Sequence, residues 1–428
     1  MSEAIPKRIG KYHVIRPLGR GATSRVYLAY DRFKARQVAI KVMQRDQAAS
    51  DEQRQQAQSA FLTEAALAGK LRHPHIAAIH DAVSEGDENY IVMEYVEGGT
   101  LEQYCRFDNL LPLDRVVELM FMACLALGHA HHEGVIHCDI KPANLLLTGD
   151  GRLKISDFGA AQYAAAAHTL LSGVGSPLYM SPEQIEDKRL NHQTDIYSIG
   201  AVMYQLLSGR PPFHGSSRES LLYQIVRIDL PPPPIARPDL PPELDRILRR
   251  ALAKSREERY LEWRELAAEF ENLFGHLKLP DQDSSEAERF SLLRQLPLFR
   301  GFGDVEVWET LRIGTWHHMR AGATPMREGE ACPGLFIIVA GDVVVGRDGR
   351  ALDTLGEGQF FGDALYFEDS AAPRGTTIAC ASPVVLLEIK AEALRRASAA
   401  CQVQFNRALL RMLVNRVERM LQGGAIGR

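Results

Sequence analysis

The sequence predicts an α+β protein in which a strand-rich part is followed by a helical part and then by a second set of strands. Three observations support this order. Up to about residue 100, short β-branched or aromatic runs are bounded by Gly, Asp and Pro. Residues 101–274 carry mainly helical patterns. From about residue 290, short apolar runs alternate with glycines, which is typical of a small antiparallel barrel or roll.

Length and composition are those of a folded protein with more than one domain. The chain has 428 residues, of which 46% are hydrophobic and 24% charged, so two or three domains are expected. A net charge of −4 leaves no basic excess for a run of phosphates, so nucleic acid is not an expected partner. The longest apolar stretch, Val116 to Leu127, is interrupted and too short to cross a membrane.

The cysteines and the first residues favour a cytoplasmic protein. The six cysteines lie far apart without a CxxC pair, so neither a disulfide framework nor a zinc site is expected. The opening MSEAIPKRIG has no apolar signal core. We therefore expect no membrane segment and a cytoplasmic location.

The elements follow in a simple order along the chain. A polar, Gln-rich stretch from Asp51 to Leu71 favours a helix between the third and fourth strands. A strand-like pair around VIHCDIKPANLLL and LKISDFG interrupts the helical part, whose last helix is expected to end at Gly275. Residues 275–290 are polar and are predicted as a linker. The end of the chain reads as an amphipathic helix that either packs on its own domain or pairs with a second copy.

The first group of functional residues surrounds two glycines. Gly19 and Gly21 lie between two predicted strands, where they could form a tight turn or let the backbone approach a phosphate. Lys41 follows in an apolar strand, where its charge is costly unless it is paired. Glu64 on the predicted helix is the natural partner, although a surface lysine would explain the strand equally well when seen alone.

The second group decides between these interpretations. The run His137-Cys138-Asp139-Ile140-Lys141-Pro142-Ala143-Asn144 is followed by Asp157-Phe158-Gly159 and then by Ser181-Pro182-Glu183. Phosphoryl transfer needs metal ligands, a carboxylate that orients the attacking hydroxyl, and cations that neutralise charge. Oxygen ligands, a carboxylate and lysines all occur here in a fixed order, so the sequence indicates this chemistry.

Residues 12–274 resemble the eukaryotic-type (Hanks-type) serine/threonine protein kinases. The resemblance implies a bilobal fold with an N-lobe over 12–96 and a C-lobe over 97–274, preceded by a tail of residues 1–11. It also implies ATP and two Mg²⁺ ions as cofactors. By this resemblance, Asp139 is the catalytic base, Lys141 neutralises the γ-phosphate, and Asn144 and Asp157 are the magnesium ligands. Lys41 contacts the other phosphates and pairs with Glu64, while Gly19 and Gly21 belong to the glycine-rich loop. The adenine pocket and the hinge are formed by Val26, Ala39, Met93, Glu94, Val96 and Leu146.

Two further positions carry expectations from the same resemblance. Glu183 is expected to pair with Arg259 and brace the lower lobe. Cys138 stands where the family usually has an arginine that grips a phosphate on the activation segment. Because a cysteine cannot pair with a phosphate, we expect that phosphorylation of this segment is not the main activating event.

Residues 291–428 form the second domain of the prediction. Glycines between its short strands need be no more than turns, but Phe361-Gly362-Asp363 followed by Pro373-Arg374-Gly375 is a more specific pattern. A small bound anion needs free backbone N–H groups and a buried arginine. This region resembles the cyclic-nucleotide-binding domains, a β-roll with flanking helices.

This second resemblance implies an allosteric cyclic nucleotide. Arg374 would hold the cyclic phosphate, Gly362 would let the backbone approach it, Asp363 would contact the ribose, and Ala364 and Thr376 would complete the site. Asp363 stands where the family usually has Glu, and Gly375 stands where members that prefer cGMP often have Thr. We therefore expect cAMP to be preferred over cGMP.

The predicted function is a serine/threonine protein kinase that phosphorylates protein substrates and is regulated in cis by this domain. Two alternatives are a signalling scaffold with an inactive kinase domain and a kinase whose last domain binds proteins instead of a nucleotide. A nucleotide-sensing transcription factor is excluded because the single helix after Cys401 leaves no space for a helix-turn-helix module.

Overall fold

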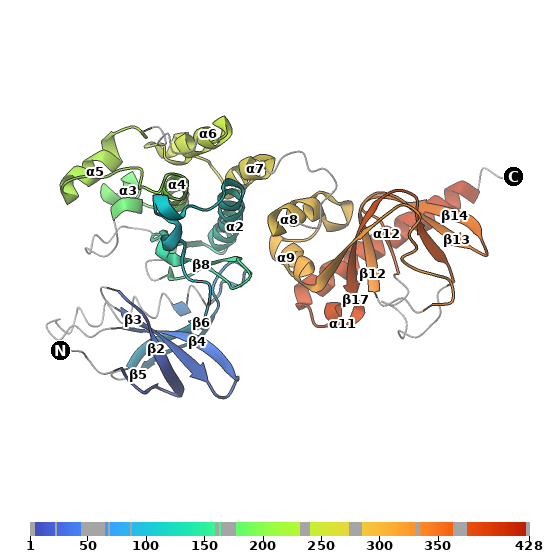
Figure 1. Cartoon of the computed structure of the whole chain (residues 1–428), viewed down its shortest axis with the longest axis horizontal. Helices are drawn as coiled ribbons and strands as arrows, with labels where there is room; N and C mark the ends of the chain where they lie inside the picture. The colour runs from blue at the N-terminus through green and yellow to red at the C-terminus, as the bar shows by residue number, and fades with distance from the viewer. Residues whose placement is uncertain are drawn as a thin grey trace. The chain divides into compact units, whose positions relative to one another are not determined.

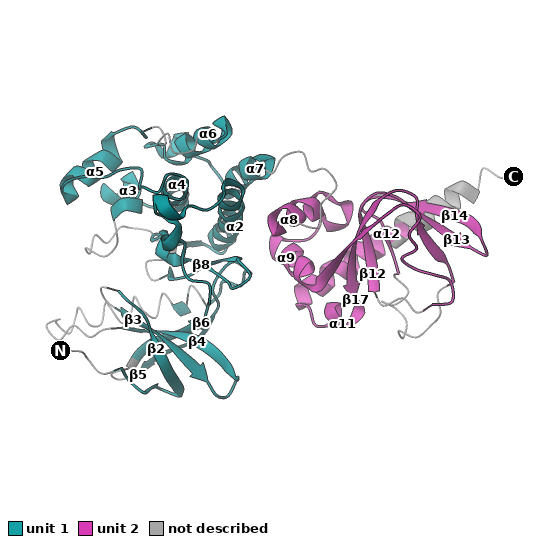
Figure 2. Cartoon of the chain, in the orientation of Figure 1, with its two compact units in different colours: residues 1–273 teal, residues 274–428 magenta. Residues whose placement is uncertain are grey.

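The computed structural model describes residues 5–21, 24–43, 65–66, 69–85, 88–158, 162–163, 177–231, 240–273, 285–330, 334–362 and 375–424. The chain divides into two compact units, Met1–Leu273 and Phe274–Arg428 (Figure 2). The prediction of a strand-rich part, a helical part and a second strand-rich part is confirmed.

The first unit begins with a six-stranded antiparallel sheet in the order β1-β2-β3-β4-β6-β5 (Figure 1). Its core contains Tyr27, Ala29, Val38, Ile40 and Val92, which are all buried. These apolar side chains alternate along the central strands, as expected for a sheet with one packed face. The strands are β1 (Arg8–Ile9), β2 (Tyr12–Arg20), β3 (Ser24–Asp31), β4 (Arg36–Met43), β5 (Ile79–Glu85) and β6 (Glu88–Glu94).

The structure differs from the sequence prediction at the start of the chain and describes little of the predicted helix over 51–71. Residues 1–11 were expected to be a tail, but Arg8 and Ile9 form β1 and pair with β2, because Ile9 adds a buried apolar side chain to the sheet core. Most of the helix predicted over 51–71 lies outside the described residues, and within it Ala65 and Ala66 are helical.

The rest of the first unit is mainly helical, as predicted. The strand-like pair also occurs, with β8 antiparallel to β9. The elements are η1 (Leu101–Tyr104), η2 (Phe107–Asn109), α2 (Leu113–His132), β7 (Val135–Ile136), η3 (Pro142–Asn144), β8 (Leu145–Leu147), β9 (Leu153–Ile155), β10 (Gln162–Tyr163), η5 (Pro177–Tyr179), α3 (Pro182–Ile185), α4 (Gln193–Ser208), α5 (Arg218–Arg227), α6 (Pro242–Ala251), η6 (Arg256–Glu258) and α7 (Trp263–Leu273).

Helix α4 is the centre of this helical part. All its residues but Gln205 are buried, and a Cβ added at Gly200 would lie 3.0 Å from the Cβ of Ala251 on α6. Helix α6 therefore packs closely against α4 where Gly200 has no side chain.

A buried ion pair braces the same region, as the sequence predicts. Arg259 is 1% exposed and donates from Nη1 and Nη2 to the Glu183 carboxylate at 2.7 and 2.9 Å. The guanidinium group also donates to backbone carbonyls, including that of Gln193 at 3.1 Å. Burial raises the pKa of Glu183, but the Arg259 charge outweighs this effect and the pKa lies below its usual value. The pair is therefore charged and ties the start of α3 to the loop before α7.

The second unit is a β-roll of two small sheets with flanking helices, as the sequence predicts. One sheet has the order β11-β17-β12-β15 and the other β14-β13-β16. The apolar residues of both sheets share one core, which includes Phe336, Ile338, Val343, Ile378 and Leu386. The elements are α8 (Glu286–Gln295), η7 (Pro297–Phe299), α9 (Asp304–Ile313), β11 (Gly314–Met319), β12 (Gly334–Ala340), β13 (Val343–Arg347), β14 (Arg350–Leu355), β15 (Phe360–Phe361), β16 (Thr377–Cys380), β17 (Val384–Lys390), α11 (Ala391–Arg395) and α12 (Ala399–Gly424).

Helix α8 begins within the segment 275–290 that the sequence analysis assigns to a linker. Ser285 caps the helix by accepting from the backbone N–H of Glu288, whose side chain accepts from the backbone of Ser285 in return. This capping box stabilises a helix start that composition alone describes as polar linker. Among the described residues, no helix combines the length and apolar character needed to span a membrane.

Three histidines pack together between the strand-rich and helical parts of the first unit. His73 and His75 precede β5 and are almost fully buried, and the ring of His73 stacks on that of His129 from α2 at 5.3 Å. The Nδ1–H of His75 donates to the carbonyl of Leu153 at 3.0 Å. Burial lowers the pKa of His75 to about 4 and lowers the pKa of His73 well below its usual value.

These buried imidazoles predict that the first unit is sensitive to acid. The folded state keeps His75 neutral, whereas the unfolded chain takes up a proton near the usual pKa of about 6.5. Its contribution to stability is complete above about pH 6.5 and is lost as the pH falls toward 4. At pH 5 the loss from His75 is about 2 kcal/mol.

Urea unfolding between pH 7.5 and pH 5 tests this prediction. His75→Gln should remove this part of the pH dependence, whereas the same change at the exposed His132 should leave it intact. Equal pH dependence in the wild type and His75→Gln would contradict the assignment.

Candidate active site

The segment between β7 and β8 brings three of the predicted site residues together. Asp139 and Lys141 lie on it, and their side chains form an ion pair with Nζ 2.6 Å from Oδ2. Asn144, at the end of η3, donates from Nδ2 to the backbone oxygen of Asp139 at 2.8 Å and to its carboxylate at 3.2 Å. Three residues that the sequence spaces over six positions therefore share one small polar site.

A second pair joins this loop region to the strand-rich part. The Nζ atom of Lys41, on β4, lies 2.5 Å from Oδ1 of Asp157, which follows β9. Partial burial raises the pKa of Asp157, but the Lys41 charge outweighs it and the pKa lies below its usual value. The carboxylate is therefore ionised at neutral pH. Glu64, the other predicted partner of Lys41, lies outside the described residues.

Asp195 on α4 holds the backbone of the catalytic loop. Its two carboxylate oxygens accept from the N–H groups of His137 and Cys138, both at 2.8 Å. Cys138 has a φ of +63°, an unfavourable conformation for a residue with a side chain, which these bonds maintain. Burial raises the pKa of Asp195 against the effect of His137 and these two bonds.

Asp195 begins the run Asp195-Ile196-Tyr197-Ser198-Ile199-Gly200, one of the runs that resemble protein kinases, but its role in holding the catalytic loop was not predicted. A signal was available, because an acidic residue in the apolar run Asp195-Ile196-Tyr197-Ser198-Ile199 is costly to bury without partners. Its partners are backbone groups far away in the sequence, and no side-chain pattern marks them.

His137 connects the two halves of the site. Its Nδ1 accepts from the backbone N–H of Asp139 at 3.3 Å, which leaves Nε2–H to donate to the carbonyl of Ser156 at 3.1 Å. Its ring also packs on the buried ring of Phe158, with centroids 4.4 Å apart. These contacts fix the positions of Asp139 and Asp157 relative to each other.

The thiol of Cys138 occupies an apolar environment. It packs against the cluster of Ile136 and Leu190, and burial raises the pKa of this thiol well above its usual value. The backbone oxygen of Cys138 accepts from Nε2 of Gln184 at 2.8 Å. The side chain is thus an uncharged packing group.

The predicted adenine pocket lies on adjacent strands. In the sheet register, Leu28 pairs with Ala39 and Ala39 pairs with Met93, so Ala39 and Met93 lie side by side on β4 and β6. Val26 pairs with Lys41 on the neighbouring strand, and Val96 follows β6. Leu146 is the middle residue of β8 and forms a bridge with Thr100, just after the segment predicted as the hinge.

Glu94 is used differently from what its place in the predicted hinge indicates. Its carboxylate pairs with Lys154 of β9 at 2.9 Å and accepts from the N–H of Ala78 at 3.1 Å. The side chain therefore connects β6 to neighbouring segments. The N–H of Glu94 also donates to the carbonyl of Ala78 at 2.8 Å, so the backbone carbonyl is the group of Glu94 that we expect to face an adenine ring. Lys154 is a second residue that the sequence analysis missed.

The glycine-rich turn has open space beside it. Gly19 pairs with Val26, and the N–H of Gly21 donates to the carbonyl of Ser24 at 2.8 Å. Among the described residues, a Cβ added at Gly19 would meet no atom within 4 Å. Packing within the described chain therefore does not require glycine here, which is consistent with a glycine kept for close approach of a ligand.

The donor atoms fit magnesium. Mg²⁺ prefers oxygen ligands, and Asp157 supplies an ionised carboxylate. Both bonds of Asn144 to Asp139 use its amide nitrogen, so its Oδ1 is the atom that can ligate a cation. The predicted ligands are thus of the right chemical kind.

The second unit presents only part of its predicted site. Gly362 follows β15, is buried and has a φ of +83°, and Thr376 precedes β16. Gly375 is held by Arg347, whose Nε donates to its carbonyl at 2.6 Å. Asp363, Ala364 and Arg374 lie outside the described residues.

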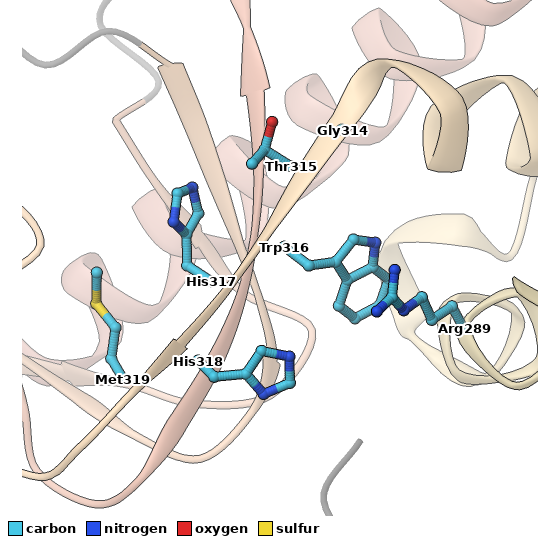
Figure 3. Close-up of a pocket in the computed structure, with 7 residues that line it drawn as sticks. All are labelled: Arg289, Gly314, Thr315, Trp316, His317, His318 and Met319. Atoms are coloured by element: carbon cyan, nitrogen blue, oxygen red, sulfur yellow. The ribbon is translucent and has the colours of Figure 1, made fainter. Parts of the chain in front are cut away.

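A pocket in the second unit lies elsewhere. It runs along β11 and is lined by Arg289 and the residues from Gly314 to Met319 (Figure 3). The guanidinium of Arg289 lies over the ring of Trp316, 5.3 Å from its centre. This lining contains neither Gly362 nor Thr376, so it is not the predicted nucleotide site.

A strand-rich and a helical part that meet at a lysine–aspartate pair and a buried catalytic loop define the protein kinase class. Residues 12–269 match the family model described as protein kinase domain. The chain therefore belongs to the protein kinase family. Residues 316–400 match the cyclic nucleotide-binding domain family.

The chain is also similar to named bacterial kinases. It is 36% identical over 300 residues to the serine/threonine-protein kinase PknB of Mycolicibacterium smegmatis, covering 68% of this chain and 47% of that protein. It is 34% identical over 300 residues to the serine/threonine-protein kinase PrkC of Bacillus subtilis, covering 69% and 46%. A probable serine/threonine-protein kinase of Streptomyces coelicolor is 36% identical over 275 residues, covering 62% and 40%. The chain spans less than half the length of these curated relatives.

Proposed function

We propose that this protein is a serine/threonine protein kinase that transfers the γ-phosphate of ATP to hydroxyl groups of protein substrates. The observation that carries the proposal is the convergence of Lys41, Asp157, Asp139 and Asn144 from separate elements on one polar site. The names of the similar bacterial kinases support the same activity.

Each side chain has a role that suits its environment. The carboxylate of Asp139 accepts the hydrogen of the substrate hydroxyl and orients its oxygen toward the phosphate. Lys141, 2.6 Å from that carboxylate, neutralises charge on the transferred group. Lys41 holds the phosphates on the other side. Asn144 and Asp157 would hold two Mg²⁺ ions, which when bound supply positive charge to the phosphates.

The proposed domains follow the predicted boundaries. The proposed kinase domain comprises 12–274, with lobes 12–96 and 97–274, and β1 (Arg8–Ile9) adds a strand to the first lobe. The proposed linker starts at residue 275 and ends before α8, so that the nucleotide-binding domain of 291–428 also takes in the start of this helix. We place the protein in the cytoplasm. The free cysteines, which include Cys105, Cys124 and Cys401, suit a reducing compartment.

Regulation by a cyclic nucleotide is the second part of the proposal. The last domain is proposed to disfavour the active arrangement of the kinase, and cAMP to relieve this inhibition. A ligand shifts such an equilibrium only by its differential affinity for two states, typically ~1–3 kcal/mol. The match of residues 316–400 to the cyclic nucleotide-binding domain family and the positive φ of Gly362 support a nucleotide site.

Replacing the proposed base tests the enzymatic function. We expect Asp139→Asn to lower kcat for phosphorylation of a basic protein substrate by about 100-fold or more, because the amide cannot accept the hydroxyl proton. The exposed surface variant Asp108→Asn should retain wild-type activity. A wild-type chain without any phosphotransfer would favour the scaffold interpretation.

The environment of Cys138 predicts how the kinase is switched on. Its uncharged thiol cannot hold a phosphate. Thr169 and Ser172 are hydroxyl residues of the predicted activation segment, and replacement of both by Ala should leave most of the activity in place. The activity is measured after phosphatase treatment of the wild type and the double variant. If the phosphatase-treated wild type and the double variant both lost their activity, this prediction would be contradicted.

The nucleotide site is tested by calorimetry on the full chain with cAMP and cGMP. We expect cAMP to bind more tightly and to raise kinase activity. Arg374→Ala should abolish both effects, because it removes the positive charge opposite the cyclic phosphate. Arg350→Ala, an exposed change in the same domain, is the control. The absence of heat with either nucleotide up to millimolar concentration would remove the ligand from the proposal.

A further inference from the structure

Two histidines and a glutamate from three different elements meet on the helical part of the first unit. His131 belongs to the last turn of α2, His192 immediately precedes α4, and Glu262 immediately precedes α7. One ligand atom from each residue lies within 4.8 Å of the others. We call these three residues the His131 cluster. It lies outside the proposed phosphoryl-transfer site.

The histidines are prepared to act as ligands. Nε2 of His192 lies 2.8 Å from the carbonyl of Leu261, which can only accept, so this nitrogen carries the proton. The lone pair of His192 is therefore on Nδ1. Metal-binding histidines usually have this kind of outer hydrogen bond to a backbone carbonyl, which fixes the tautomer and the orientation of the ring.

His131 and Glu262 complete a suitable donor set. His131 brings an imidazole and Glu262 a carboxylate within reach of His192. Both histidines are half-buried, whereas Glu262 is exposed and can move toward them. Two imidazole nitrogens and one carboxylate oxygen, with water as a fourth ligand, form a set that zinc accepts.

The present ring geometry shows what binding requires. The two rings are stacked with centroids 3.9 Å apart and planes 24° apart, so their lone pairs do not yet point to one position. His192 is held by Leu261, so binding would require the His131 ring to turn about its Cβ–Cγ bond until one of its nitrogens and Nδ1 of His192 point to the same cation.

We propose that the His131 cluster is a binding site for a divalent transition metal, with Zn²⁺ as the probe, that joins the end of α2 to the start of α4. The site lies next to the two elements that hold the catalytic loop between β7 and β8. His131 lies four residues before Val135 of β7, and His192 lies three residues before Asp195, which holds the N–H groups of His137 and Cys138. A bound metal would connect the two supports of this loop.

The experiment is calorimetric titration of the full chain with Zn²⁺, after removal of metals with a chelator and in saturating Mg²⁺. The wild type should bind one more equivalent of Zn²⁺ than the His131→Ala/His192→Ala double variant. Glu262→Gln should weaken the same binding event by about tenfold or more, since even outer-shell partners contribute this much. His214→Ala, an exposed histidine on the same unit, should bind like the wild type.

Two further measurements separate a site from a folding defect or an unspecific effect. Circular dichroism must show that the zinc-free variants keep the wild-type fold, and Glu262→Gln changes only an exposed side chain. Hydrogen exchange at residues 135–139 should slow when Zn²⁺ binds to the wild type but not to the double variant. Equal stoichiometry and affinity in the wild type and the double variant would overturn the site. Unchanged exchange upon binding would overturn the connection to the loop.

Discussion

The geometry of the candidate active site depends on one buried carboxylate. Asp195 receives two backbone N–H groups from the catalytic loop, at His137 and Cys138, and these bonds keep Cys138 in a left-handed conformation. The next residue, Asp139, lies beside Lys141 and Asn144. Left-handed conformations cost energy for residues other than glycine and persist only where the surrounding structure imposes them.

The buried pair of Glu183 and Arg259 supports Asp195 from the other side. Arg259 donates to the carbonyl of Gln193, the first residue of α4, as well as to Glu183. A buried pair of charges contributes little net stability, but removal of one partner is strongly destabilising. Its effect here is to fix the start of α4, and with it the carboxylate that holds the loop. Two buried carboxylates, Glu183 and Asp195, thus help to position the partly buried carboxylate of Asp139.

The sequence predicts the elements of this protein better than the contacts between them. The order of strands and helices follows from hydrophobic patterns, whereas the pairing of Glu183 with Arg259 follows from the resemblance to protein kinases. The ion pair of Glu94 does not follow, because its partner Lys154 lies 60 positions away on β9 and meets Glu94 only in the folded chain. The strand at Arg8 and Ile9 was not predicted for another reason: a strand of two residues is too short to show an alternating pattern.

The His131 cluster illustrates the same limit in a functional setting. Metal sites are recognisable in a sequence where cysteines are closely spaced, and no such spacing exists here. His131, His192 and Glu262 are separated by about sixty and seventy positions and come together because α4 and α7 both pack against α2. Such a site is visible only after folding.

The location of the cluster also defines what a metal could do there. The catalytic loop follows α2 and β7 in the chain, and Asp195 of α4 binds its backbone at His137 and Cys138. A cation that binds both α2 and the start of α4 therefore favours the conformations in which these two helices have the spacing that the loop requires. A ligand changes an equilibrium only by binding one state more tightly than the other. Because the cluster contacts neither the proposed phosphate nor the proposed hydroxyl site, any effect of the metal on phosphoryl transfer must pass through the position of this loop.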